Sequence, residues 1–170
     1  MSATWLPPEQ YAETLVKATA FACLFVTDEH DRPVQLRAVY SQDHPWQWPG
    51  GTMEPDERPW QTAVRECREE TGIVFGGPPR LLAAVFGLPG AQWPYNTVGF
   101  VFDGGRLTAE EMASITLDPE EHDEVRALAV EEWRAHMPRQ DFARLEAVMA
   151  ARRTGTTAYF DTWDWGDGDC

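Results

Sequence analysis

The stretch PWQTAVRECREET, which is followed by a glycine, constrains the fold of this 170-residue chain more than any other. Pro59 suits the first turn of a helix, and Gly72 suits the left-handed position just past its end. At about 100° per residue, the apolar side chains fall on one arc of that helix. The adjoining arc carries three glutamates: Glu66, Glu69 and Glu70. The pattern predicts a helix over residues 59–71 that has a core side and an acidic side.

Two interpretations account for the acidic side of this helix. Like charges three or four residues apart destabilise a helix by a few tenths of a kcal/mol per pair, and a cation between them reverses that effect. Carboxylate oxygens crowded on one rigid helix suit Mg²⁺ or Mn²⁺, which also bind water and phosphate oxygens. The alternative is a set of solvated glutamates balanced by Arg65 and Arg68. The spacing of the residues around the helix decides between the two.

The glycines and charged residues from position 51 onward follow the pattern G-x5-E-x7-R-E-U-x-E-E-x-G-U, where U is a bulky apolar residue or cysteine. Every position of the pattern is filled, by Gly51, Glu57, Arg65, Glu66, Cys67, Glu69, Glu70, Gly72 and Ile73. A match by chance somewhere in the chain has a probability of roughly a few in ten million. The stretch therefore resembles the signature of the Nudix hydrolase family.

The resemblance implies an α/β fold, a Nudix-type α/β/α sandwich with a mixed β-sheet. It also implies a pyrophosphohydrolase that cleaves a phosphoanhydride in a nucleoside diphosphate linked to a group X. The expected substrates are a nucleoside triphosphate, ADP-ribose or a nucleotide sugar, and the expected cofactor is Mg²⁺ or Mn²⁺.

The positions of the signature imply a role for each charged residue. The metal ligands would be Glu66, Glu69, Glu70 and the backbone carbonyl of Gly50 or Gly51. Glu69, or next Glu66, would be the general base, because the helix offers no histidine or lysine. Glu57 and Arg65 would pair and brace the preceding loop against the helix.

A carboxylate outside the signature often completes the metal site in this family. We expect Glu124, in EEHDEVRAL, to be that ligand, followed by Glu121. A solvated acid in a loop is the alternative for either residue. We expect the neighbouring His122 to be an exposed loop residue rather than a base.

Aromatic residues on both sides of the signature are candidates for binding a nucleobase, because stacking on a flat side chain is worth about 1–3 kcal/mol. Trp93 and Tyr95, in the loop PGAQWPY, come ahead of Trp48 and Trp46, in HPWQWPGG. Packing in the core or in an interface is the alternative for each of them. Arg37 is a candidate for a bidentate phosphate contact, with an ordinary surface arginine as the alternative.

The chain around the signature alternates between strand and helix patterns, which favours an α/β sandwich. Strands are predicted at residues 18–27, 34–40, 80–88, 96–103 and 125–130. Further helices are predicted at residues 8–17, 108–115 and 139–153. The first two strands should form a hairpin across the turn DEHDRP. We expect one Nudix domain over residues 1–155 and an acidic aromatic tail over residues 156–170.

The charge of the chain narrows its partners. It has 28 acidic and 14 basic residues and a formal net charge of −14, which would repel duplex nucleic acid. A small molecule derived from a nucleotide is the expected substrate. Two alternatives stay open, namely a Nudix-fold sensor that binds a nucleotide metabolite without hydrolysis and a hydrolase of capped RNA ends.

Other features bear on location and assembly. No run of about 18 apolar residues occurs, no secretory signal pattern opens the chain, and the three cysteines form no C-x-x-C pair. We therefore expect a cytoplasmic protein that does not enter a membrane, with Cys23 and Cys67 buried. The tail is too apolar for complete solvation, which suggests a homodimer contact. Its apolar residues are Tyr159, Phe160, Trp163 and Trp165.

Overall fold

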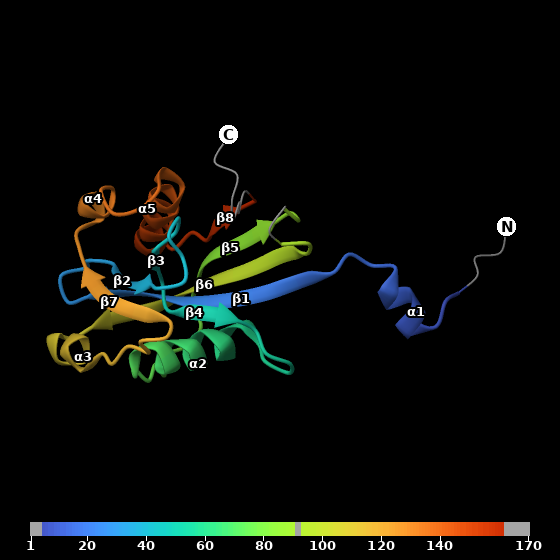
Figure 1. Ribbon diagram of the computed structural model, residues 1–170, viewed down its shortest axis with the longest axis horizontal. Coiled ribbons are helices and arrows are strands. Elements are labelled where there is room, and N and C mark those ends of the chain that lie inside the picture. Colours follow the sequence, from blue (N-terminus) through green and yellow to red (C-terminus); the bar gives the residue numbers. More distant parts are fainter. Residues whose placement is uncertain (1–4, 91–92, 162–170) are drawn as a thin grey trace.

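The computed structural model of the chain describes residues 5–90 and 93–161. Its central layer is a five-stranded sheet (Figure 1). The strands are β1 (Ala18–Asp28), β4 (Gly50–Thr52), β5 (Leu81–Gly87), β6 (Asn96–Leu107) and β8 (Ala158–Phe160). In the order β4-β1-β6-β5-β8, the first and third neighbouring pairs are antiparallel and the other two are parallel. The predicted mixed sheet is confirmed.

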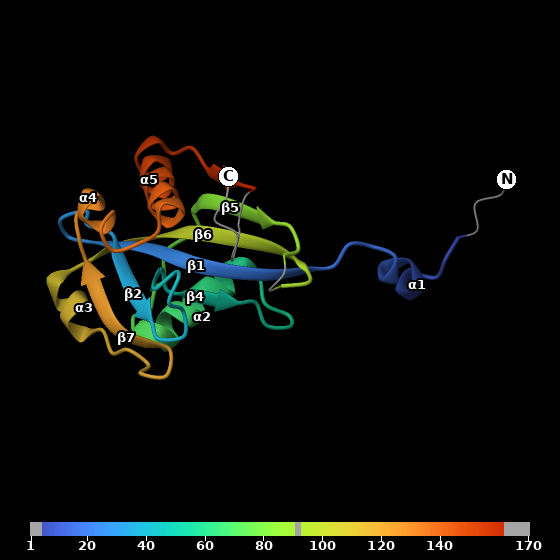
Figure 2. The same cartoon turned by 45° about the horizontal axis from the view of Figure 1, so that its top comes forward.

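Two helices cover opposite faces of this sheet, α2 (Pro59–Thr71) and α5 (Arg139–Thr154) (Figures 1 and 2). The alternation along β1 explains why both faces are covered, because successive strand side chains point to opposite sides. Leu24 packs in the cluster on the α2 side and Phe25 in the cluster on the α5 side, and both are fully buried. Burial of one such side chain contributes about 1.5–3 kcal/mol. The predicted α/β/α sandwich is confirmed.

The helix predicted from the signature is present with its predicted bounds. Pro59 occupies its first turn, and Gly72 follows it with φ 75° and donates its N–H to the carbonyl of Arg68. Ala63 and Cys67 are buried on the core side of α2. Cys23 is buried in β1, so the prediction that these two cysteines are buried is confirmed.

A second sheet has three antiparallel strands and forms one end of the molecule. They are β2 (Val34–Ala38), β3 (Trp46–Gln47) and β7 (His122–Ala127), in the order β3-β2-β7. The predicted hairpin between the first two strands is wrong, because β1 and β2 share only the isolated bridge between Thr27 and Pro33. The edges of β1 are taken by β4 and β6, so β2 turns away and pairs with β3 and β7.

The remaining elements differ from the sequence predictions mainly at their ends. Helix α1 (Pro8–Glu13) is shorter than predicted and buries no residue, α3 (Ala109–Ser114) matches the predicted third helix, and α4 (Val130–Trp133) was not predicted. Residues 158–160, assigned to the tail, form β8 and pair with β5. Trp163 and Trp165 lie outside the described residues. Among residues 5–90 and 93–161, every helix is too short or too polar to cross a bilayer.

The pairing of β4 with β1 generates a prediction about stability. A Cβ atom at Gly50 would lie 2.3 Å from the Cβ atom of Cys23 and 2.5 Å from the carbonyl oxygen of Ala22. Gly50→Ala should therefore lower the free energy of unfolding by about 1–3 kcal/mol, as overpacking does in other cores. Urea unfolding measures the change. Gly76→Ala is the matched control, since nothing lies within 4 Å of its added Cβ, and equal losses in the two variants would contradict the packing argument.

Candidate active site

The buried carboxylate of Glu70 joins the acidic side of α2 to the edge of the sheet. Its side chain is 3% exposed, and its Oε2 accepts the backbone N–H of Gly50 at 2.9 Å. Burial raises the pKa of Glu70 to about 8, with a smaller contribution from neighbouring acids such as Glu66. The structure therefore places the predicted metal ligand Glu70 in a buried position beside other acids. A carboxylate held this way binds a cation more readily than it stays ionised alone.

Arg65 neutralises the other carboxylates of the helix. Its guanidinium contacts Glu57 with Nε at 2.7 Å and Nη2 at 3.0 Å. Its Nη1 lies 2.8 Å from Glu66 and 3.0 Å from Glu69. The hydrogen bond from Arg65 lowers the pKa of Glu57 to about 2, and Glu57 raises the pKa of Arg65. The predicted pair of Glu57 and Arg65 is present, and it fixes the loop before α2 to the helix.

Gly51 brings the backbone of β4 against the helix. A Cβ atom at this position would lie 2.5 Å from Oε1 of Glu66, so any larger residue would push the Glu66 carboxylate away from the strand. Glu66 has a side chain that is 15% exposed, and burial raises its pKa. The backbone of Gly51 and the carboxylate of Glu66 are therefore neighbours, as the metal site implied by the signature requires.

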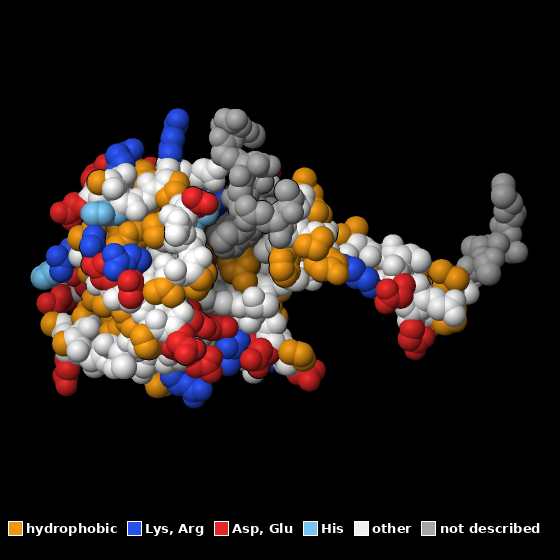
Figure 3. Space-filling model, in the orientation of Figure 1, with side chains coloured by type: hydrophobic (Ala, Val, Ile, Leu, Met, Phe, Trp, Pro, Cys, Tyr) orange, Lys and Arg blue, Asp and Glu red, His pale blue; other side chains and the backbone are white. Residues whose placement is uncertain are grey.

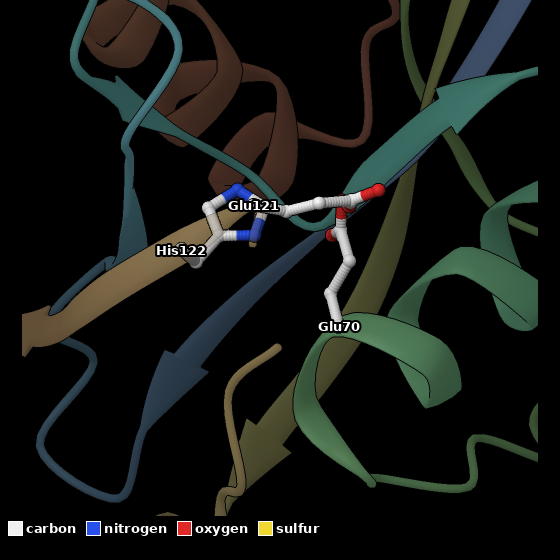
Figure 4. Close-up of side chains that lie close together, drawn as sticks. All are labelled: Glu70, Glu121 and His122. Atoms are coloured by element: carbon white, nitrogen blue, oxygen red, sulfur yellow. The ribbon is translucent and has the colours of Figure 1, made fainter. Parts of the chain in front are cut away.

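Residues at the start of the second sheet approach the carboxylate of Glu70. Glu121, in the turn before β7, and His122, its first residue, meet Glu70 from α2 (Figure 4). One possible ligand atom from each of the three residues lies within 4.8 Å of the other two. Oxygen donors and imidazole both bind divalent cations, so the group fits a metal site.

Glu124, the first choice for this role, is not one of these three residues. It pairs with Nη1 of Arg37 at 3.0 Å and with Arg126. Arg37 also forms a bidentate pair with Asp123, at 2.7 and 2.9 Å. These ion pairs on the second sheet account for both residues, and Glu121, the second choice, is the acid that lies near Glu70.

The prediction that His122 is an exposed loop residue is wrong. Its side chain is 1% exposed, it begins β7, and its backbone N–H donates to the carbonyl of Asp118 at 2.7 Å. The ring of Tyr40 packs on the imidazole with centroids 6.3 Å apart. Burial lowers the pKa of His122. The sequence pattern placed the strand three residues later, because His122 and Asp123 are not typical strand residues.

A cavity of about 530 Å³ lies beside the carboxylates and is lined by Gly50, Gly51 and Thr52. Five aromatic side chains form part of the remaining wall. Its rings belong to Phe21, Tyr40, Trp46, Trp48 and Trp93. The space-filling view shows acidic and basic side chains together along the α2 region of this face (Figure 3).

The structure brings three of the four predicted aromatic residues to this cavity. Trp46 is 7% exposed and packs edge-on against Trp133, so it also belongs to the core. Trp48 packs on Phe25, and Trp93 donates its Nε1–H to Oγ1 of Thr19 at 3.1 Å. The fourth, Tyr95, contacts the ring of Trp93, and neither it nor Arg37 is among the residues that line the cavity.

Polar residues of the cavity were not identified from the sequence. Gln35 is 3% exposed, and its Nε2 has no hydrogen-bond partner among the described residues; the same holds for the buried Nε1 of Trp48. On α5, Asp141 pairs with Nδ1 of His44 at 2.7 Å and with Nη1 of Arg144 at 3.1 Å. These residues come from four separate elements and loops, so no local pattern could have grouped them.

Known proteins resemble this chain in sequence and in fold. The profile of the NUDIX domain family matches residues 16–151. A Mycobacterium tuberculosis (strain ATCC 25618 / H37Rv) protein that carries the name 8-oxo-dGTP diphosphatase 3 is 39% identical over 79 residues, which is 44% of this chain and 36% of that protein. Human diphosphoinositol polyphosphate phosphohydrolase 2 is 48% identical over 54 residues, 31% of this chain and 29% of that protein. The chain thus spans about a third of the length of these relatives.

A similar structure covers nearly the whole domain. The crystal structure of the MutT protein from Methanosarcina mazei Go1 superposes with a TM-score of 0.65 over 82% of this chain and 98% of that chain. The two sequences are 22% identical, so the likeness concerns the fold.

The pair of Glu57 and Arg65 generates a prediction about pH. The pKa of Glu57 falls from its ordinary value of 4.5 to about 2 on folding, so its contribution to stability is complete above pH 4.5 and is lost as the pH falls toward 2. Glu57→Gln should therefore unfold with a smaller pH dependence than the parent chain across this window. Urea unfolding at several pH values gives the two slopes. Glu110→Gln, on α3, should keep the parent slope, and an unchanged slope in Glu57→Gln would contradict the assignment.

Proposed function

The chain belongs to the Nudix hydrolase family, and on that premise we propose that it is a divalent-metal-dependent pyrophosphohydrolase acting on a nucleoside diphosphate linked to a group X. One observation carries the proposal: Gly50 and Gly51 line the aromatic cavity and also contact or closely approach Glu70 and Glu66. A substrate with its ring in the cavity would therefore have its phosphates beside the carboxylates. This arrangement matches a nucleotide in which a planar base and a phosphate chain are joined by a sugar.

The residues proposed to hold Mg²⁺ or Mn²⁺ are Glu66, Glu69, Glu70 and Glu121, with the carbonyl of Gly51. A bound cation of this kind polarises a phosphoryl oxygen and lowers the pKa of a coordinated water. Glu69 is the proposed base, with Glu66 next, because its side chain is 48% exposed and can meet a water that enters from solvent. Arg65 restrains both carboxylates, and Glu57 restrains Arg65, so the pair positions the reacting groups.

The lining of the cavity favours a nucleobase over a polyanion. The buried N–H groups of Trp48 and Gln35 lack acceptors among the described residues, and a heterocycle supplies acceptors as carbonyl oxygens or ring nitrogens. The basic side chains of the described lining, His44 and Arg144, both contact Asp141. A diphosphoinositol polyphosphate would need many more cations than this wall offers.

Three substrate classes stay within the proposal, a nucleoside triphosphate, ADP-ribose and a nucleotide sugar. The alternative of a sensor without hydrolysis is less favoured, because every glutamate of the signature is present, and each one either pairs with Arg65 or accepts the N–H of the cavity residue Gly50. Hydrolysis of capped RNA ends is less favoured by the net charge of −14. A cytoplasmic location and a homodimer formed through residues 156–170 also stay predictions.

Removal of the carboxylates tests the reaction. Glu69→Gln and Glu70→Gln should each lower turnover by roughly 100-fold or more, because proton transfer and charge neutralisation are lost while side-chain volume is kept. The assay follows nucleoside monophosphate release from each substrate class with Mg²⁺ and, separately, Mn²⁺. Glu110→Gln serves as the control on α3. Near-normal turnover in both active-site variants, with folding unchanged, would contradict the proposed site.

The cavity makes a separate prediction about substrate binding. Trp48→Phe keeps a ring but removes the indole N–H, which should raise KM roughly 3- to 10-fold with a smaller effect on kcat, as the loss of about 0.5–1.5 kcal/mol implies. Inorganic triphosphate has no base, so its inhibition constant should not change. Trp60→Phe, which removes an indole packed on Phe75 and Phe102, is the matched control. An equal weakening of inorganic triphosphate would show that Trp48 does not contact the base.

A further inference from the structure

We propose that His122 is a ligand of the divalent metal ion, so that the site combines an imidazole nitrogen with the carboxylate oxygens of Glu70 and Glu121. The inference rests on the proposed metal site and adds a donor of a different chemical type. The side-chain nitrogens that the signature places on the acidic side of α2 belong to arginines. Arginines stay protonated and therefore cannot bind a metal.

The burial of His122 is the first observation behind the proposal. The side chain is 1% exposed, and its Nδ1 has no hydrogen-bond partner among the described residues. A buried ring nitrogen without a partner is rare in native proteins, because burial removes its hydrogen bond with water and no other hydrogen bond replaces it. A metal ion at this place would satisfy the nitrogen, and Nδ1 is therefore the proposed donor atom.

The distances to the neighbouring acids are the second observation. Possible ligand atoms of Glu70, Glu121 and His122 all lie within 4.8 Å of one another. Two ligands on opposite sides of an ion, each about 2.1 Å from it, are about 4.2 Å apart. The three atoms are thus close to coordination spacing without a large rearrangement. Figure 4 shows the ring and the two carboxylates converging from α2 and from the start of β7.

The backbone around His122 holds this orientation. Its N–H donates to the carbonyl of Asp118 at 2.7 Å, and the carbonyl of Glu121 accepts the N–H of Val39 at 2.9 Å. Consecutive residues of a strand point to opposite faces, but Glu121 lies in the turn before β7, so its side chain and that of His122 can meet. The register of β7 against β2 pairs His122 with Ala38 and fixes the ring at the end of the sheet nearest α2.

A nitrogen ligand changes which metal the site prefers. Mg²⁺ binds almost entirely to oxygen, whereas Mn²⁺ and Co²⁺ also accept imidazole and gain affinity from it. The preference of this site for Mn²⁺ and Co²⁺ over Mg²⁺ should therefore be larger than the preference of a site made of carboxylates alone.

The test measures Mn²⁺ binding to the full chain by electron paramagnetic resonance, without substrate. Electron spin-echo modulation of bound Mn²⁺ should show coupling to a nitrogen nucleus, and labelling the protein with ¹⁵N-histidine should change that coupling. His122→Asn should abolish the coupling and weaken Mn²⁺ binding on the order of 10-fold or more, with a smaller effect on Mg²⁺ measured by competition. His30→Asn, on an exposed turn, is the matched control.

The outcomes separate the two proposals. Mn²⁺ bound to the parent chain without histidine coupling would overturn the role of His122 and leave the carboxylate site standing. Coupling that persists in His122→Asn would also overturn it. Absence of Mn²⁺ binding by the parent chain would overturn both the nitrogen ligand and the proposed metal site. Because the labelling experiment uses the parent sequence, a folding defect in the variant does not affect it.

Discussion

The contact between the Glu70 carboxylate and the Gly50 amide holds the candidate active site together. It connects the one helix that carries the signature glutamates to the edge strand whose backbone borders the aromatic cavity. Both partners are constrained by the fold: Gly50 can tolerate no Cβ against Cys23, and Glu70 sits among buried residues of α2. This hydrogen bond sets the distance between α2 and β4, and hence the distance between the carboxylates and the cavity.

The carboxylates of the site differ in the groups that neutralise their negative charge. Arg65 balances Glu57, Glu66 and Glu69 on the solvent side of the helix, where each carboxylate keeps a cationic partner. Glu70, on the inner side, accepts the backbone N–H of Gly50 and pairs with no cation among the described residues, and its burial raises its pKa. The acidic side of α2 is therefore divided into a part neutralised by the protein and a part that requires a proton or a cation. With a cation bound at the inner part, a chain with strong negative charge could receive the proposed phosphate substrate.

Local sequence patterns predicted the parts of the site that lie within a single segment. The helix over residues 59–71, its glycine end and the pairing of Glu57 with Arg65 all depend on contacts between residues close together in the chain. The burial of His122 could not be predicted in this way, since it depends on the pairing of β7 with β2. The wrong prediction of a hairpin between β1 and β2 has the same origin. The strands β4 and β6 pair with the two edges of β1, and both are distant from the predicted turn in the sequence. The cavity likewise needs α5 beside β1, which no short pattern encodes.

The register of Ala38 with His122 closes a long loop, and this closure has a consequence for how the protein folds. The half of the site formed by β4 and α2 depends on contacts between residues close in sequence, whereas Glu121 and His122 are brought to it by the pairing of β7 with β2. Loop closure on this scale carries an entropic cost that grows with the logarithm of the loop length. A ligand that binds both halves favours the closed loop by mass action. Binding of the proposed metal and the ordering of the second sheet would therefore be linked equilibria, each of which would strengthen the other.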